Sequence, residues 1–175
     1  MEGRKIGFFG GCFNPPSNIH IELAKKVLQE NNLDSVIFVP VGDFYQKEEL
    51  LDFENRVNML RLSIGKEEKL GIEDYEGKVK KKLYATDIFE ALSEKYKNDD
   101  IYYIMGSDNF EKMPNWKNYE EIKDKYKYIV VKRDEQDISS TGIRNMIKAG
   151  DEKARDILNE DVYEHIKKYK LYRGE

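Results

Sequence analysis

The fold is decided by the segment KIGFFGGCFNPPSNIHIELAKKVL, which spans residues 5–28. Residues 5–9 form a short apolar run that predicts a buried strand, and two glycines then end the run. Apolar side chains recur at helical spacing over residues 19–30, with Asn18 as the expected N-cap. A strand that passes through a glycine turn into a helix is the opening unit of an α/β fold.

The alternation of strands and helices continues along the rest of the chain. Further strands are predicted at 36–39, 70–73, 101–105 and 128–131, and helices at 53–64, at 85–96 and from 139 onward, with a loop at 41–52. Strands with so little polar alternation are typical of a parallel sheet that is buried on both faces. We therefore predict a Rossmann-like α/β fold, a doubly wound parallel sheet with helices on both faces and a helical C-terminal tail. We expect a single domain over residues 1–175, with its core over 1–135 and the helical segment over 136–175.

The composition of the chain limits the classes of partner that it can be expected to bind. Over 175 residues, 30 Lys and Arg stand against 34 Asp and Glu, a net charge of −4, so a broad basic surface for nucleic acid is not expected. No apolar run approaches the roughly 20 residues of a membrane span, so we expect no membrane partner. The single cysteine excludes an internal disulfide and favours a cytoplasmic location. A small anionic ligand in a local basic pocket remains compatible with this charge, and the oligomeric state is left open.

The loop after the first strand has the residues of a phosphate site. Ligands of doubly wound folds bind beyond the carboxyl ends of the strands. Gly10 and Gly11 allow backbone N–H groups to approach a phosphate, and the loop runs into a helix N-terminus, which favours anions. His20, in the first helical turn, can donate a hydrogen bond to a phosphate oxygen. The alternative is a tight turn beside a packed histidine.

A second loop, Ile138 to Arg144, has a similar character. Three hydroxyl residues precede a predicted helix, and an arginine follows in its first turn. Hydroxyl groups, helix-start N–H groups and a guanidinium group on one spot suit a polyphosphate. The alternative is an ordinary N-cap followed by a surface arginine.

Together the two loops resemble those of the nucleotidyltransferases with a His-x-Gly-His or Thr-x-Gly-His phosphate loop. Within that superfamily the chain is similar to the nicotinate and nicotinamide mononucleotide adenylyltransferases. Residues 138–144 match Ile-Ser-Ser-Thr-x-Ile-Arg, residues 10–16 match Gly-Gly-x-Phe-Asp/Asn-Pro, and residues 106–116 fit Gly-x-Asp…Trp. The resemblance covers most of the chain, and further positions that fit it are Lys47, Arg56, Met59, Tyr84, Asp87, Val162, Ile166, Leu171 and Tyr172.

The resemblance implies adenylyl transfer from ATP to nicotinate mononucleotide, with release of pyrophosphate, in NAD synthesis. It implies Mg²⁺ that arrives with ATP, and no metal site formed by the protein itself. It assigns catalysis to His20, Ser17, Lys47 and Arg144. It assigns ATP contacts to Gly10, Gly11, Cys12, Phe13, Asn14, His20, Gly106, Asp108, Ser139, Ser140, Thr141 and Arg144. It assigns acceptor contacts to Lys47, Arg56, Tyr84, Ala85 and Trp116.

Several positions depart from the family pattern. Ser17 and Ile19 replace the first His or Thr and the Gly of the phosphate loop, and Gln46 replaces the His before the lysine. Leu83 and Ala85 replace a serine and a threonine near the acceptor. These departures keep two alternatives open. One is a related transferase with another acceptor, such as nicotinamide mononucleotide or phosphopantetheine, or a cytidylyl transferase. The other is a nucleotide-binding domain without catalysis.

Overall fold

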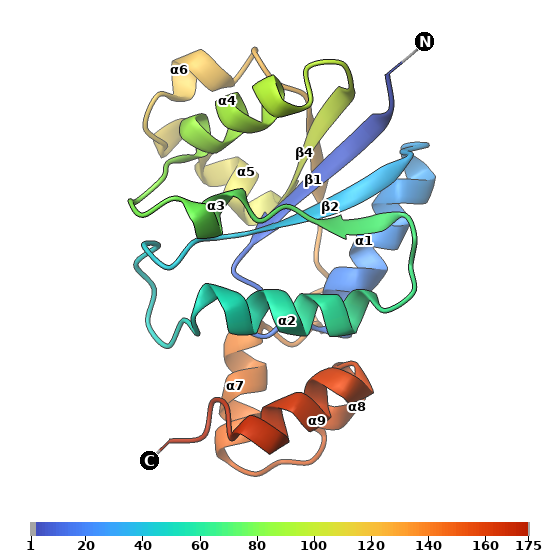
Figure 1. The fold of residues 1–175 in the computed structure, drawn as a ribbon, viewed down its shortest axis with the longest axis vertical. Coiled ribbons are helices and arrows are strands. Elements are labelled where there is room, and N and C mark those ends of the chain that lie inside the picture. The colour runs from blue at the N-terminus through green and yellow to red at the C-terminus, as the bar shows by residue number, and fades with distance from the viewer. Residues whose placement is uncertain (1–2, 175) are drawn as a thin grey trace.

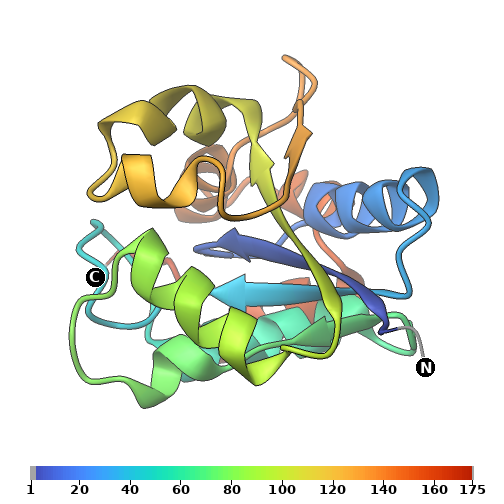
Figure 2. The same ribbon diagram turned by 90° about the horizontal axis from the view of Figure 1, so that it is seen from above.

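The computed structural model describes residues 3–174 and contains a five-stranded parallel sheet with the order β3-β2-β1-β4-β5. Figure 1 shows this sheet at the centre of the molecule, and in Figure 2 the arrows of β1 and β2 point the same way. The predicted Rossmann-like, doubly wound α/β fold is confirmed. The strands are β1 (Lys5–Gly11), β2 (Ser35–Pro40), β3 (Leu70–Ile72), β4 (Asp100–Gly106) and β5 (Tyr128–Val131).

The longer helices follow the apolar periodicity of the sequence. They are α1 (Asn18–Glu30), α2 (Phe53–Ile64), α4 (Ala85–Lys95), α7 (Ser140–Lys148) and α9 (Glu160–Tyr169). Shorter elements are α3 (Tyr75–Lys78), α5 (Ser107–Lys112), a 3₁₀ turn (Met113–Asn115), α6 (Tyr119–Ile122) and α8 (Ala154–Ile157). Of these, α8 lies within the tail that was predicted to be helical, and the others were not predicted. Elements of one or two turns are too short to show a helical period.

Helices cover both faces of the sheet. On one face α1 and α2 pack on Phe9 and Phe38, and on the other α4 and α6 pack on Phe8 and Tyr103. Figure 1 shows α2 below the sheet and α4 and α6 above it. The strands between these layers are apolar on both sides because both sides are covered.

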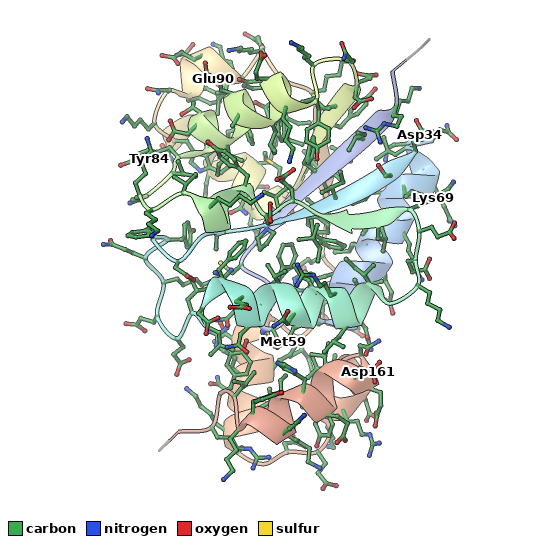
Figure 3. The ribbon with its side chains drawn as sticks, viewed as in Figure 1. Asp34, Met59, Lys69, Tyr84, Glu90 and Asp161 are labelled. Atoms are coloured by element: carbon green, nitrogen blue, oxygen red, sulfur yellow. The ribbon has the colours of Figure 1, made fainter. Side chains whose placement is uncertain are left out.

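The predicted helical C-terminal tail forms a further layer beneath α2. Met59 of α2 is fully buried there with Ile143 of α7 and Val162 of α9. Figure 3 labels Met59 between α2 and these C-terminal helices. Leu158, which we expected within a helix, is instead buried in the link between α8 and α9. This packing fixes α7, and therefore its N-terminus, relative to the sheet.

Several predicted element ends are wrong by one or two residues; β2 and β4, for example, each extend one residue further at both ends than predicted. The N-cap of α1 is Ser17, and Asn18 is the first helical residue. Strand β1 continues through Gly10 and Gly11 because their backbone pairs with β2 as far as Pro40. Tyr96 is the C-cap of α4 rather than part of the helix. Between residues 3 and 174 no helix is both long and apolar enough to cross a bilayer.

Candidate active site

The candidate site lies at the carboxyl ends of β1 and β4. The chain runs outward from β1 through β2 to β3 and then returns to place β4 on the other side of β1. Such a reversal of strand order is where doubly wound folds bind ligands. A Cβ atom added at Gly10 or at Gly106 would meet no atom within 4 Å. The two neighbouring strands therefore end beneath open space.

His20 is fixed by the start of helix α1. The backbone N–H of Ser17 donates to Nδ1 of His20 at 2.9 Å, and the Ser17 hydroxyl lies 3.2 Å from the same nitrogen. Because Nδ1 accepts this hydrogen bond, the proton of the neutral ring is on Nε2. The ring also packs edge to face against Phe13, with centroids 5.2 Å apart. His20 thus presents a fixed N–H donor.

Burial keeps this imidazole neutral. The His20 side chain is almost inaccessible to solvent, and burial, with a smaller contribution from the charge of Arg133, lowers the pKa of His20 from its usual 6.5 to about 4. Protonation would also cost the hydrogen bond that Nδ1 accepts from Ser17. At neutral pH His20 is therefore an uncharged hydrogen-bond donor.

This lowered pKa predicts a pH-dependent stability. Between about pH 6.5 and pH 4 the unfolded chain binds a proton at His20 that the folded chain does not, so stability falls as the pH falls. The lowered pKa of His20 contributes about 3 kcal/mol to the free energy of unfolding above pH 6.5, and this contribution is lost near pH 4. Urea unfolding at pH 7 and at pH 4.5 measures this effect. We expect the free energy of unfolding to fall less between these two pH values for His20→Gln than for wild type, because the variant lacks the titrating imidazole. His165→Gln is the matched control: burial also lowers the pKa of His165, but that side chain is less buried, so this variant should change the pH slope less than His20→Gln does. Identical pH slopes for wild type and His20→Gln would contradict the prediction.

The N-terminus of α7 lies against the first loop. The Ser139 hydroxyl accepts the N–H of Gly142 at 3.1 Å and so caps the helix, as an N-cap serine does. The Ser140 hydroxyl donates to the carbonyl oxygen of Pro15 at 3.1 Å. Two of the three predicted hydroxyl groups therefore hold the helix start and the first loop together.

Arg144 connects α7 to the loop after β1. Its side chain is 5% exposed. Its guanidinium group donates from Nη1 to the Asn14 carbonyl oxygen at 2.9 Å and from Nη2 to the Thr141 hydroxyl at 3.2 Å. Nε lies 3.4 Å from a carboxylate oxygen of Glu49. This buried cation has one anionic partner, which comes from the loop at 41–52.

That loop carries Lys47 into the site. Its ammonium group lies 3.8 Å from the sulfur of Cys12 in the first loop. Asn14, which is buried, anchors the far end of the loop: its amide donates to the Glu49 carbonyl oxygen, and its side-chain oxygen accepts the N–H of Leu51. The two loops therefore form one hydrogen-bonded unit.

Arg56, which is predicted to contact the acceptor, lies in α2 and binds backbone carbonyl groups of two loops. Its side chain is fully buried, with Nε donating to the Leu51 carbonyl oxygen at 2.7 Å and Nη1 to the Cys12 carbonyl oxygen at 3.0 Å. Its third partner is Asp43, at 3.5 Å. Direct contact with an acceptor stays a prediction, and the observed contacts join the two loops beneath the site.

The remaining predicted residues lie around the end of β4. Asp108 is exposed in the first turn of α5, directly beyond Gly106. Ala85 and Trp116 both pack, half-buried, on the cluster under α4. Tyr84 is 41% exposed at the start of α4, and Figure 3 shows it at the edge of the molecule. The acceptor contacts of these residues stay predictions.

Sequence reasoning missed four residues near the site. Glu49 and Lys148 form an ion pair with each other, and Glu49 also pairs with Arg144. Arg133, after β5, is close enough for its charge to lower the pKa of His20. The hydroxyl of Tyr172 donates to the side-chain oxygen of Asn14 at 2.7 Å. Of these, only the position of Tyr172 within a motif gave any signal in the sequence.

Comparison with known proteins agrees with this geometry. A family model described as cytidylyltransferase-like matches residues 8–146. The nicotinate-nucleotide adenylyltransferase of Bacillus subtilis is 33% identical over 184 residues, which cover 95% of each chain. A Clostridium tetani protein assigned to the same activity is 34% identical over 97% of this chain and 100% of its own. The chain belongs to the nicotinate-nucleotide adenylyltransferase family.

Solved structures of adenylyltransferases share the fold. A Vibrio parahaemolyticus protein assigned as a nicotinate-nucleotide adenylyltransferase aligns with a TM-score of 0.78 at 26% identity, over 98% of this chain and 97% of its own. The nicotinic acid mononucleotide adenylyltransferase of Plasmodium falciparum, complexed with NaAD, aligns with a TM-score of 0.80 at 20% identity, over 97% of each chain. The predicted resemblance to the adenylyltransferase family is confirmed.

Proposed function

We propose that this protein is a nicotinate-nucleotide adenylyltransferase, which transfers the AMP group of ATP to nicotinate mononucleotide in NAD synthesis. The observation that carries the proposal is that the loop after β1 contacts all three predicted catalytic groups: Ser17 contacts His20, Cys12 contacts Lys47 and Asn14 contacts Arg144. The named relatives match over nearly the whole chain, which supports the same acceptor. We further propose that the chain acts as one nucleotidyltransferase domain and that it works in the cytoplasm.

The reaction needs positioning and charge stabilisation more than a protein nucleophile. An oxygen of the acceptor phosphate attacks the α-phosphorus of ATP and forms a new P–O–P linkage. The bond between the α-phosphorus and the oxygen that bridges it to the β-phosphate breaks. Pyrophosphate leaves with the electron pair of that bond. Because the acceptor phosphate is already anionic, no general base is required, and in-line placement supplies much of the rate enhancement.

Each residue has a distinct role in this proposal. The Nε2–H of His20 donates to oxygens of the α- and β-phosphates, where negative charge develops. Lys47 bridges the acceptor phosphate and ATP, since its loop brings it to the first loop at Cys12. Arg144 and the N-terminus of α7 hold the β- and γ-phosphates. Ser17 supports His20 through its backbone N–H and its hydroxyl group.

We expect Mg²⁺ to arrive with ATP and to be bound mainly by the phosphates. Within residues 3–174, no group of three or more His, Cys, Asp or Glu side chains is placed to hold a metal ion. Mg²⁺ is commonly bound by phosphate oxygens and water with one or two carboxylates, and it neutralises charge on the triphosphate. Asp108, exposed at the end of β4, is the carboxylate that we assign to the hydrated ion.

A panel of acceptors tests the function. The purified protein is incubated with Mg-ATP and with nicotinate mononucleotide, nicotinamide mononucleotide or phosphopantetheine, and pyrophosphate release is followed. We expect the highest kcat/KM with nicotinate mononucleotide, despite Leu83 and Ala85. Faster turnover with another acceptor, or with CTP in place of ATP, would replace the proposed substrates. ATP binding without turnover on any acceptor would identify a non-catalytic nucleotide-binding protein.

A further inference from the structure

Helix α7 presents two cations on one face, one turn apart, and both contact the same carboxylate. Glu49 places Oε2 at 3.4 Å from Nε of Arg144, and its other oxygen pairs with the ammonium group of Lys148. The backbone of Glu49 is held by the Asn14 amide, which donates to its carbonyl oxygen at 3.0 Å. One carboxylate from the loop at 41–52 therefore bridges the two cations of α7.

The arrangement is one that a phosphate group can take over. Two oxygens of one anion contact an arginine and a lysine, which is how phosphate oxygens are also bound. Arg144 is almost completely buried, whereas Lys148 and Glu49 are 37% and 44% exposed at the side chain, so the pair is open to solvent on the side of the loop. Hydrogen bonding to Lys148 is the main cause that holds the pKa of Glu49 below its usual range. Glu49 is thus an anion at neutral pH.

We propose that Glu49 occupies the position of a nucleotide phosphate, and that Lys148 joins Arg144 in binding the triphosphate once ATP displaces the Glu49 carboxylate. The inference rests on the proposed function only in taking ATP as the nucleotide. A triphosphate carries several negative charges where Glu49 carries one, so it competes effectively for the two cations. Glu49 in turn provides the buried guanidinium with an anionic partner when no nucleotide is bound.

The test separates two roles of Lys148. If Lys148 only holds Glu49, then Lys148→Gln loosens the Glu49 carboxylate, which competes with ATP. The affinity for ATP is then unchanged or higher. If Lys148 binds phosphate, the same substitution weakens ATP binding. The Glu49 carboxylate is absent both from Glu49→Gln and from the double variant Glu49→Gln/Lys148→Gln, so these two proteins differ only in Lys148. Their comparison therefore measures the direct contribution of Lys148.

Mg-ATP, inorganic triphosphate and AMP are titrated into each protein by calorimetry. We expect Glu49→Gln to bind Mg-ATP about three-fold more tightly than wild type, in the range of one partly exposed ion pair. We expect the double variant to bind Mg-ATP and triphosphate about three- to ten-fold more weakly than Glu49→Gln. AMP, which lacks the β- and γ-phosphates, should bind the two proteins equally.

Glu48→Gln and Lys153→Gln are matched controls, since both side chains are exposed close to the substituted residues in sequence. Equal affinity of Glu49→Gln and the double variant for ATP would overturn the role of Lys148. Unchanged or weaker ATP binding by Glu49→Gln would overturn the role of Glu49. These outcomes need no turnover, so failure of every acceptor would refute the proposed function and leave this inference standing. No ATP binding by wild type would overturn both.

Discussion

Replacing His20 with alanine is expected to lower kcat by at least about 10²-fold, the lower range for one lost transition-state donor. The side chain is buried and neutral, and its Nδ1 is occupied by the backbone N–H of Ser17, so Nε2–H is the group left to face the phosphates. A donor aimed at developing charge contributes more in the transition state than in the ground state. The decrease should therefore appear in kcat as well as in kcat/KM for ATP.

Two measurements keep this prediction separate from misfolding. The thermal midpoint of His20→Ala is compared with that of wild type, and activity is measured well below the lower midpoint. His165→Ala, which alters the chain's other histidine in helix α9, should retain nearly full kcat. A kcat for His20→Ala within about three-fold of wild type would remove His20 from the mechanism, because even the weaker electrostatic donors contribute more than that.

The second large effect is on stability and concerns Arg56. Arg56→Met keeps the length of the side chain but removes every hydrogen-bond donor. The carbonyl oxygens of Leu51 and Cys12 then lose their guanidinium partner beneath the site. Each buried polar group left unpaired costs about 1–3 kcal/mol, so we expect a loss of about 2–5 kcal/mol in the free energy of unfolding.

Urea unfolding of Arg56→Met measures this loss. Arg61→Met is the matched control, because Arg61 lies on the same helix, α2, and is exposed. We expect the control to change stability by less than about 0.5 kcal/mol, as is usual for surface substitutions. A loss of similar size in the two variants would contradict the assignment of Arg56 as the residue that joins the two loops.

The strand–loop–helix pattern could be predicted because it depends on local sequence. Residues 5–9 are apolar enough to form a buried strand of a parallel sheet, and apolar side chains at helical spacing follow over residues 19–30. The motif at 138–144 likewise carries both its helix cap, Ser139, and its guanidinium group, Arg144, within one short segment. Short-range periodicity and capping preferences are properties of neighbouring residues, so the sequence alone reports them.

The partners of these residues could not be predicted in the same way. Glu49 is separated from Arg144 by 95 residues and from Lys148 by 99, and nothing in the loop at 41–52 marks it as their counter-ion. The hydroxyl of Tyr172 reaches Asn14 across 158 residues. Nothing in the sequence marks the Leu51 and Cys12 carbonyl oxygens as partners of Arg56, which is fully buried in α2, and its predicted contact with the acceptor stays a prediction.

The sequence by itself determined the succession of the main strands and helices, the two loops that are predicted to bind anions, and the family to which the chain belongs. The tertiary structure alone decided which side chains meet at the ends of β1 and β4, and which anion faces Arg144 before a nucleotide binds. The reason is physical. A strand or a helix start is selected by interactions among residues close in the chain, whereas a buried charge takes its partner from whichever segment the packed layers bring within reach.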